Sequence, residues 1–228
     1  MCSGSHLQIA GISKIIRIYA MRDNHLATWI SRPTNQKIFS LWSRLTEPYY
    51  YIQDKLWGLD YANDKDTSYL GRKNHPYAQG SASYFKQFIS ESKQFGPIEN
   101  FIDVGCGKGR MVITAEASRE FKIVIGVDYS FDLVKTARLN IIKKGFKSII
   151  YTANAEEFLL PPGRFLIYMF NPFDQDVLMR FVQNNMTSLH AYSSVILYHN
   201  KVYSQTLIDM GFNQKASRLG YNTAFYWL

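Results

Sequence analysis

Residues 101–110 of the chain read Phe-Ile-Asp-Val-Gly-Cys-Gly-Lys-Gly-Arg. The apolar run over 101–104, with Asp103 as its single acid, predicts a buried strand of a parallel sheet. Three glycines then alternate with other residues, and helical spacing resumes from Met111 to Ala117. Glycine tolerates the positive φ of a tight turn and lets a ligand approach the backbone, while a helix start presents unpaired N–H groups to an anion. This order of strand, glycine turn and helix indicates a nucleotide-type site in an open α/β sheet.

The spacing of the glycines narrows the kind of site. Gly105, Gly107 and Gly109 form G-x-G-x-G, which is neither the dinucleotide fingerprint nor the P-loop pattern. The string resembles the first motif of the class I S-adenosylmethionine-dependent methyltransferases, in which the loop wraps the methionine end of the cofactor. The resemblance implies S-adenosylmethionine as cofactor, and Asp103, Gly105, Cys106, Gly107 and Gly109 as residues that bind it. The alternative is a glycine-rich turn without a ligand.

A second buried strand over 121–128 ends in an acid, Asp128. An acid at this distance beyond the glycine loop can accept hydrogen bonds from both ribose hydroxyls of a bound nucleoside. Tyr129 follows directly and is placed to lie against the adenine. The alternative is that Asp128 serves the start of the next helix, over 131–144, but Ser130 already provides an N-cap there.

A third strand over 147–151 leads to Asn154 and Ala155. Members of the methyltransferase family often carry an Asp-Ala pair here, whose acid contacts the adenine amino group. The amide oxygen of Asn154 can still accept from an amine, as a neutral rather than charge-assisted bond. We therefore expect Asn154 and Ala155 to border the adenine.

The alternation of strands and helices continues to a C-terminal hairpin over 212–228. Two further strands are expected over 165–170 and 193–198. The resemblance implies an α/β fold: a Rossmann-like, seven-stranded methyltransferase sheet with helices on both faces and a C-terminal β-hairpin, plus a helical N-terminal extension. Parallel strands place their carboxyl ends on one edge of a sheet. We expect that edge to carry Gly105, Asp128, Asn154, Asn171 and His199.

The fourth strand ends in Asn171-Pro172-Phe173. This string resembles the Asn-Pro-Pro-aromatic motif of amino-group methyltransferases with one residue missing. It also matches the Phe-Asn-Pro-Phe string of a small bacterial methyltransferase subgroup. The resemblance implies that Asn171 orients the acceptor or borders the cofactor sulfonium, and that Phe173 stacks on a planar acceptor. The alternative is a strand-end turn in which Asn171 bonds its own backbone and Phe173 lies in the core.

Two segments before the glycine loop also resemble that subgroup. Residues 54–60 read Asp-Lys-Leu-Trp-Gly-Leu-Asp, and a His-x-Tyr segment at 75–77 follows. The resemblance implies that Tyr77 closes over the methionine end of the cofactor. His75 is either a surface histidine or a base. We expect two regions: an aromatic-rich extension over 1–75 and an S-adenosylmethionine-binding domain over 76–228.

The first 45 residues are strongly basic. Apolar positions between Leu7 and Met21 recur at helical spacing, and six Lys or Arg accompany one acid, Asp23, over 1–45. This pattern favours a surface helix that packs on the domain or on a partner. The alternative is a basic amphipathic helix on an anionic membrane surface.

Composition limits the class of protein. The net charge of +8 and the pI near 9.3 favour anionic partners. Cys2 and Cys106 are unsuited to a structural disulfide, and no apolar run reaches membrane-spanning length, so we expect a cytoplasmic protein. The five histidines are scattered without metal-ligand spacing, so no metal site is expected.

Three functions remain open at this stage. The first is methyl transfer to a small-molecule or glycan-type acceptor, because many members of the bacterial subgroup lie among polysaccharide-type genes. The second is methylation of an amino group in a nucleic acid or a protein. The third is a cofactor-binding scaffold or interaction subunit that performs no transfer; intact cofactor positions argue against it.

Overall fold

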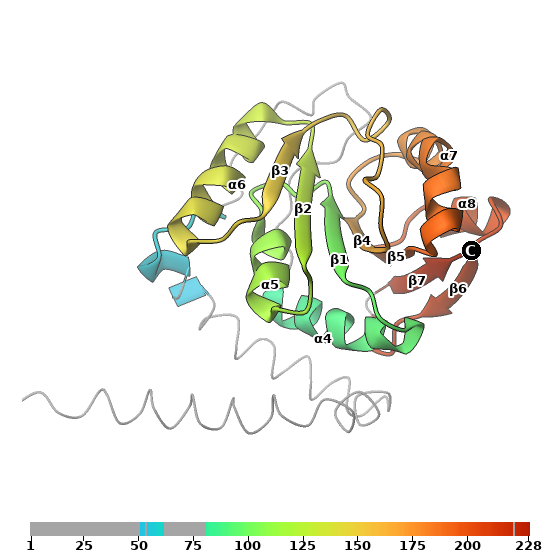
Figure 1. Cartoon of the computed structure of the whole chain (residues 1–228), viewed down its shortest axis with the longest axis horizontal. Helices are drawn as coiled ribbons and strands as arrows, with labels where there is room; N and C mark the ends of the chain where they lie inside the picture. Colours follow the sequence, from blue (N-terminus) through green and yellow to red (C-terminus); the bar gives the residue numbers. More distant parts are fainter. Residues whose placement is uncertain (1–50, 53, 62–80, 221) are drawn as a thin grey trace, which may run out of the picture.

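The computed structural model describes residues 51–52, 54–61, 81–220 and 222–228. Its centre is a seven-stranded sheet of order β3-β2-β1-β4-β5-β7-β6 (Figure 1). Strands β1 to β5 are parallel, and β7 runs antiparallel to both β5 and β6. The strands span Asn100–Val104, Ile123–Asp128, Ile149–Thr152, Phe165–Phe170, Val195–His199, Asn213–Ala216 and Thr223–Trp227. The expected methyltransferase sheet with its terminal hairpin is confirmed.

Helices alternate with the strands along the chain, except that β3 is followed by β4 and β6 by β7. They span Ala82–Ser92 (α4), Arg110–Ser118 (α5), Phe131–Lys144 (α6), Gln175–Tyr192 (α7) and Ser204–Asp209 (α8), and a 3-10 turn covers Lys93–Phe95. Ser130 caps α6 by accepting from the Leu133 amide, and Asp174 caps α7 by accepting from the Val177 amide at 3.1 Å. These caps satisfy backbone donors that a helix start leaves unpaired. The starts of α5 and α6 that the sequence predicts, at Met111 and Phe131, are correct to within one residue.

The two faces of the sheet bury separate cores. Helices α4, α5 and α6 cover one face, and their apolar side chains pack with alternate residues of the strands, as Phe85 does with Phe101 and Tyr168. Helices α7 and α8 cover the other face, where Phe181 and Leu207 are fully buried. Strand β4 is covered on both sides, and its sequence is accordingly apolar or aromatic throughout. No helix within the described ranges is long and apolar enough to span a membrane.

The carboxyl ends of the parallel strands meet along one edge. The register pairs Val104 with Val127, and Phe170 with His199. The residues that follow β1, β2 and β4 therefore come together above the sheet, as the sequence predicts. The basic segment 1–45 and residues 75–77 lie outside the described residues.

Candidate functional site

The glycine loop after β1 turns back toward the end of β2. Gly105, Gly107 and Gly109 all have positive φ, of 84°, 52° and 81°. The amides of Gly105 and Cys106 both donate to the Val127 carbonyl, at 2.8 and 3.0 Å. These hydrogen bonds attach the loop to the end of β2. A residue other than glycine would be strained at the three positions with positive φ.

The loop also touches the turn after β4. A Cβ built on Gly105 would lie 2.3 Å from the Cβ of Pro172. Only a glycine lets the loop and the Asn-Pro-Phe turn approach this closely. The contact places Asn171, the expected acceptor-side residue, directly beside the expected cofactor loop.

Asp128 holds the glycine loop from the inside. Its Oδ2 accepts from the Gly107 amide at 2.8 Å, and its Oδ1 accepts from the Ser130 amide at 2.9 Å. Each carboxylate oxygen has a second lone pair that can accept from a hydroxyl. The side chain thus joins the end of β2, the start of α6 and the loop at the position where the sequence predicts the ribose.

Asp103 lies beneath this carboxylate in β1. It is 3 % exposed, and its carboxyl makes no hydrogen bond to any described residue. Burial, and secondarily the charge of Asp128, raise the pKa of Asp103 well above its ordinary value. A nearby cation would relieve both effects.

This set of donors and acceptors fits S-adenosylmethionine. Asp128 supplies an anionic acceptor pair suited to ribose hydroxyls, and Asp103 supplies a buried acid suited to the α-ammonium group. The loop from Gly105 to Gly109 supplies the close-approach backbone that a ligand needs. Bound here, the cofactor would contribute the reactive methyl group.

The expected adenine residues lie at the adjoining strand ends. Tyr129 is partly buried directly after β2, and Ala155 is buried in the turn after β3. Asn154 is exposed; its Oδ1 accepts from the Glu156 amide and its Nδ2 donates to a Glu156 carboxylate oxygen, both at 3.2 Å. Their contacts with adenine stay predictions.

Cys106 is a buried free thiol within the loop. A Cβ on Gly126 would lie 2.9 Å from the Cys106 Sγ, so the thiol packs tightly against β2. Burial, and then the charges of Asp128 and Asp103, raise its pKa well above the ordinary value. The thiol stays neutral at pH 7, which suits a small loop residue and not a nucleophile.

Asn171 adopts a left-handed backbone, with φ of 41°. Its Oδ1 accepts a hydrogen bond from the Tyr198 hydroxyl at 3.0 Å. Tyr198 is 2 % exposed, and burial raises its pKa to about 12, so the hydroxyl keeps its proton at pH 7. A neutral donor on the neighbouring strand therefore fixes the orientation of the Asn171 amide. Sequence reasoning missed Tyr198, which lies within an apolar strand.

Of the other two expected catalytic residues, the structure describes only Phe173. Phe173 is 4 % exposed and packs in the core that α7 covers. Its ring lies in the core and not at the rim, so it does not offer a stacking face to an acceptor. Tyr77 lies outside the described residues.

His199 joins the site from the end of β5. Its Nδ1 lies 2.5 Å from the Thr223 hydroxyl, and its ring lies 4.6 Å from the Phe170 ring and 5.5 Å from the Phe88 ring. Burial lowers its pKa to about 4. The sequence placed His199 on the edge of the sheet that carries the strand ends but assigned it no role. Its position as a titratable residue at the carboxyl end of a parallel strand was the signal that could have marked it as a site residue.

The match to a known family covers the centre of the chain. A family described as "Methyltransferase domain" matches residues 97–209, just under half of the chain. The matched range begins before β1 and ends with α8, so it contains the glycine loop, Asp128 and Asn171. No curated protein matches the chain in sequence.

Solved structures that match the chain share little sequence with it. An S-adenosylmethionine-dependent methyltransferase from Clostridium acetobutylicum is 18% identical, with a TM-score of 0.43, over 75% of this chain and 63% of that one. A ribosomal protein L11 methylase from Lactobacillus delbrueckii is 12% identical, with a TM-score of 0.48, over 66% and 79%. The methyltransferase domain of bacterial CtHen1 is 13% identical, with a TM-score of 0.49, over 64% and 97%. The chain thus spans just under two thirds of the first of these proteins, and identities this low carry no information on the acceptor.

The family match agrees with the resemblance first seen in the glycine loop. The sheet order, with its antiparallel β7, and the joining of Asp128 to that loop agree with it too. Residues 97–209 therefore form a class I S-adenosylmethionine-dependent methyltransferase domain, and this domain implies S-adenosylmethionine as cofactor.

Proposed function

We propose that the chain transfers a methyl group from S-adenosylmethionine to a small-molecule or glycan-type acceptor that Asn171 orients. The observation that carries this proposal is the contact of the Asn171-Pro172 turn with Gly105. An acceptor held by Asn171 would be next to the loop that binds the cofactor. Methyl transfer is an in-line displacement, so alignment of acceptor and donor is the main task of the protein.

The Tyr198 hydroxyl gives Asn171 a fixed direction. Because Asn171 Oδ1 accepts from a buried neutral hydroxyl, the amide is not free to flip without losing that bond. An amide oxygen has two lone pairs, so it can accept from more than one donor. An oriented amide supports positioning of an uncharged hydroxyl or amine.

His199 supports a hydroxyl acceptor in particular. A hydroxyl must lose its proton as the carbon–oxygen bond forms and the carbon–sulfur bond breaks. His199 is neutral at pH 7, because burial lowers its pKa to about 4, and the Thr223 hydroxyl holds its Nδ1. We assign His199 the role of receiving that proton, directly or through one water, as a weak base, because the burial that keeps the ring neutral also disfavours its protonated form.

Methylation of an amino group in a nucleic acid has less support. That chemistry uses an aromatic ring after the Asn-Pro turn to stack on a base, but Phe173 is buried in the core. The net charge of +8 alone attracts any polyanion without specificity. Methylation of an amino group in a protein keeps no support beyond Asn171 itself.

Isotope transfer tests the proposal. The purified full chain is incubated with a cell extract and S-adenosylmethionine labelled in the methyl group, and label is followed by mass spectrometry in small-molecule, glycan, nucleic-acid and protein fractions. We expect label in the small-molecule or glycan fraction. Asn171→Ala should leave cofactor affinity within about tenfold but lower turnover by about a hundredfold, the scale of one lost positioning contact.

The other outcomes are equally informative. Label in RNA, DNA or protein would overturn the proposed acceptor class. Tight binding of S-adenosylmethionine, measured by calorimetry, without transfer to any fraction would favour the scaffold. Normal turnover by Asn171→Ala on the labelled product would reduce Asn171 to a structural turn residue.

A further inference from the structure

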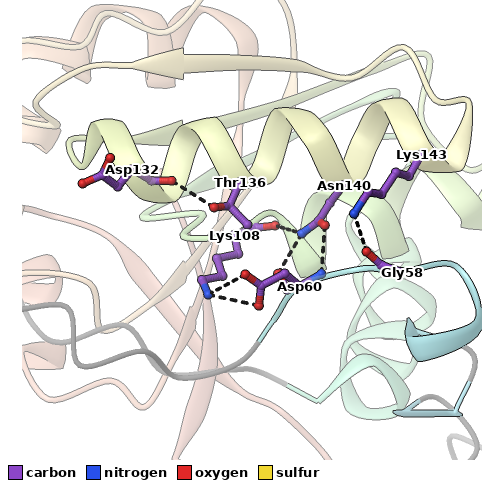
Figure 2. Close-up of polar contacts among 7 residues, drawn as sticks. All are labelled: Gly58, Asp60, Lys108, Asp132, Thr136, Asn140 and Lys143. Atoms are coloured by element: carbon purple, nitrogen blue, oxygen red, sulfur yellow. Dashed lines mark hydrogen bonds and ion pairs between the residues drawn. The ribbon is translucent and has the colours of Figure 1, made fainter.

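Lys108 in the glycine loop and Arg110 at the start of α5 both bind to one segment earlier in the chain. Lys108 Nζ lies 3.2 Å from both carboxylate oxygens of Asp60, and Arg110 Nη2 lies 3.1 Å from Asp54 Oδ2 (Figure 2 shows the Lys108 pair). The Lys108 side chain is only 2% exposed and that of Arg110 only 8%. These are buried cations whose acidic partners come from about fifty residues earlier in the chain. The two acids are the first and last residues of the Asp-Lys-Leu-Trp-Gly-Leu-Asp string.

Asn140 of α6 fastens the same segment to the loop. Its Oδ1 accepts from the Asp60 amide at 3.0 Å, and its Nδ2 donates to the Asp60 carbonyl at 2.9 Å and to the Lys108 carbonyl at 3.1 Å (Figure 2). One buried side chain therefore joins the segment 54–61, helix α6 and the loop. Lys143 of the same helix donates to the Gly58 carbonyl.

Apolar burial adds to these polar contacts. Leu59 and Tyr61 are 6% and 5% exposed and belong to the core under α4, α5 and α6. The guanidinium of Arg110 lies 5.4 Å from the centre of the Tyr61 ring. The segment 54–61, which the sequence assigned to the extension, thus packs as part of the domain.

The two sides of the loop are held by different partners one residue apart. Asp128 accepts from the Gly107 amide on the side of the loop that faces the end of β2, whereas Asp60 and Asn140 bind Lys108 on the side that faces the segment 54–61. A buried ammonium that loses its partner is strongly destabilised. Undocking of the segment would take the Asp60 carboxylate away from Lys108, and the loop backbone that carries Lys108 would lose a contact that positions it.

We propose that the segment 54–61 is a positioning element of the cofactor site, whose docking and cofactor binding favour one another. The segment contacts the loop at Lys108, whereas we expect the cofactor on the side of the loop that Asp128 contacts. Coupling between two binding events is reciprocal, so each must strengthen the other by the same factor. This inference rests on S-adenosylmethionine as cofactor and is independent of the acceptor.

The first test measures the coupling on the unmodified full chain. Hydrogen exchange of the amides of residues 54–61 is followed by mass spectrometry with and without saturating S-adenosylmethionine. We expect slower exchange in this segment when the cofactor is bound. Equal exchange in both states, with cofactor binding shown by calorimetry, would overturn the coupling and leave the cofactor assignment intact.

The second test uses Asp60→Asn, which removes the negative charge but keeps the size of the side chain. The Asp60 side chain is 51% exposed, so the variant should fold. We expect its affinity for S-adenosylmethionine, measured by calorimetry, to fall about tenfold, and Asp60→Glu to recover part of the loss. Glu120→Gln, which breaks the exposed pair of Lys93 and Glu120 before the start of β2, is the matched control and should bind normally.

The two remaining results are decisive. A lower melting temperature for Asp60→Asn with unchanged affinity would show a merely structural contact and overturn the proposal. No binding of S-adenosylmethionine by the wild-type chain would overturn the proposal together with the cofactor assignment.

Discussion

The change of Asp128 to asparagine should weaken both the folded state and the cofactor site. The carboxylate accepts from the Gly107 amide at 2.8 Å and from the Ser130 amide at 2.9 Å. Asparagine offers one oxygen and one NH₂ group, so one of these two amides would face a donor. A buried donor without an acceptor costs about 1–3 kcal/mol, which corresponds to a fall in Tm of roughly 2–10 °C for a chain of this size.

The cofactor should lose more than the fold does. A hydrogen bond from a ribose hydroxyl to a charged carboxylate contributes about 1.5–3 kcal/mol, so the loss of one such bond should lower affinity by about ten- to a hundredfold. A partial compensation is expected because the charge of Asp128 is one cause of the raised pKa of Asp103. We therefore expect both the fall in Tm and the loss of affinity to lie in the lower half of their ranges.

Thermal unfolding and calorimetric titration with S-adenosylmethionine measure the two effects on the same samples. Asp132→Asn is the control, because Asp132 carries the same charge four residues later but is exposed in the first turn of α6. An exposed substitution of this kind should change stability by no more than about 0.5 kcal/mol. Wild-type Tm and affinity in Asp128→Asn would refute the reasoning on both the loop and the ribose.

The site supports three further predictions. Gly105→Ala should abolish measurable cofactor binding and lower Tm, because the residue has a φ of 84° and its new Cβ would clash with the proline of the Asn-Pro-Phe turn. Gly145→Ala is the control: its φ is 66° but the space around it is open, so it should lower stability by only about 1 kcal/mol. An equal loss of stability at both positions in thermal unfolding would contradict the close approach of the loop to the turn. Tyr198→Phe should lower turnover about tenfold with unchanged cofactor affinity, because the Asn171 amide loses its orienting donor; unchanged steady-state kinetics would remove that role. His199 should make the folded state progressively less stable as the pH falls from 6.5 toward 4, by roughly 2–3 kcal/mol at most, because its pKa is about 4 in the folded chain and the unfolded chain binds the proton at higher pH. His199→Gln should remove this part of the dependence of Tm on pH. The same dependence in both proteins would contradict the prediction.

The fold was predictable from local signals that agree with one another. Ser130 and Asp174 mark the starts of α6 and α7, and Gly145 ends α6 in a left-handed conformation. Apolar runs of strand length alternate with these helices, and parallel strands place their carboxyl ends together. The positions of Asp128 and Asn171 on one edge follow from this rule alone.

The interactions within the site were not predictable in the same way. The hydrogen bond between Tyr198 and Asn171 joins two strands 27 residues apart, and nothing in an apolar strand marks one tyrosine as an orienting donor. The burial of Phe173 depends on how α7 packs after the turn, which no local pattern encodes. The low pKa of His199 needs the desolvating aromatic neighbours that only the fold brings together.

The ion pair of Lys108 and Asp60 was not predictable from the sequence either. In the sequence, the glycine loop was recognised as resembling the methyltransferase family and the string over 54–60 as resembling its bacterial subgroup, but the two were not connected. Their contact spans 48 residues and depends on Asn140 of α6, which carried no signal of its own. Long-range pairs between charged residues have no periodicity from which sequence reasoning can find them.

The most direct test of the central claim is a crystal structure of the full chain with S-adenosylhomocysteine, the demethylated product of the cofactor. We expect the ligand at the carboxyl ends of β1 and β2, with its ribose hydroxyls bonded to the Asp128 carboxylate and its α-ammonium group near Asp103. A ligand bound elsewhere, or a ribose that does not contact Asp128, would contradict the account.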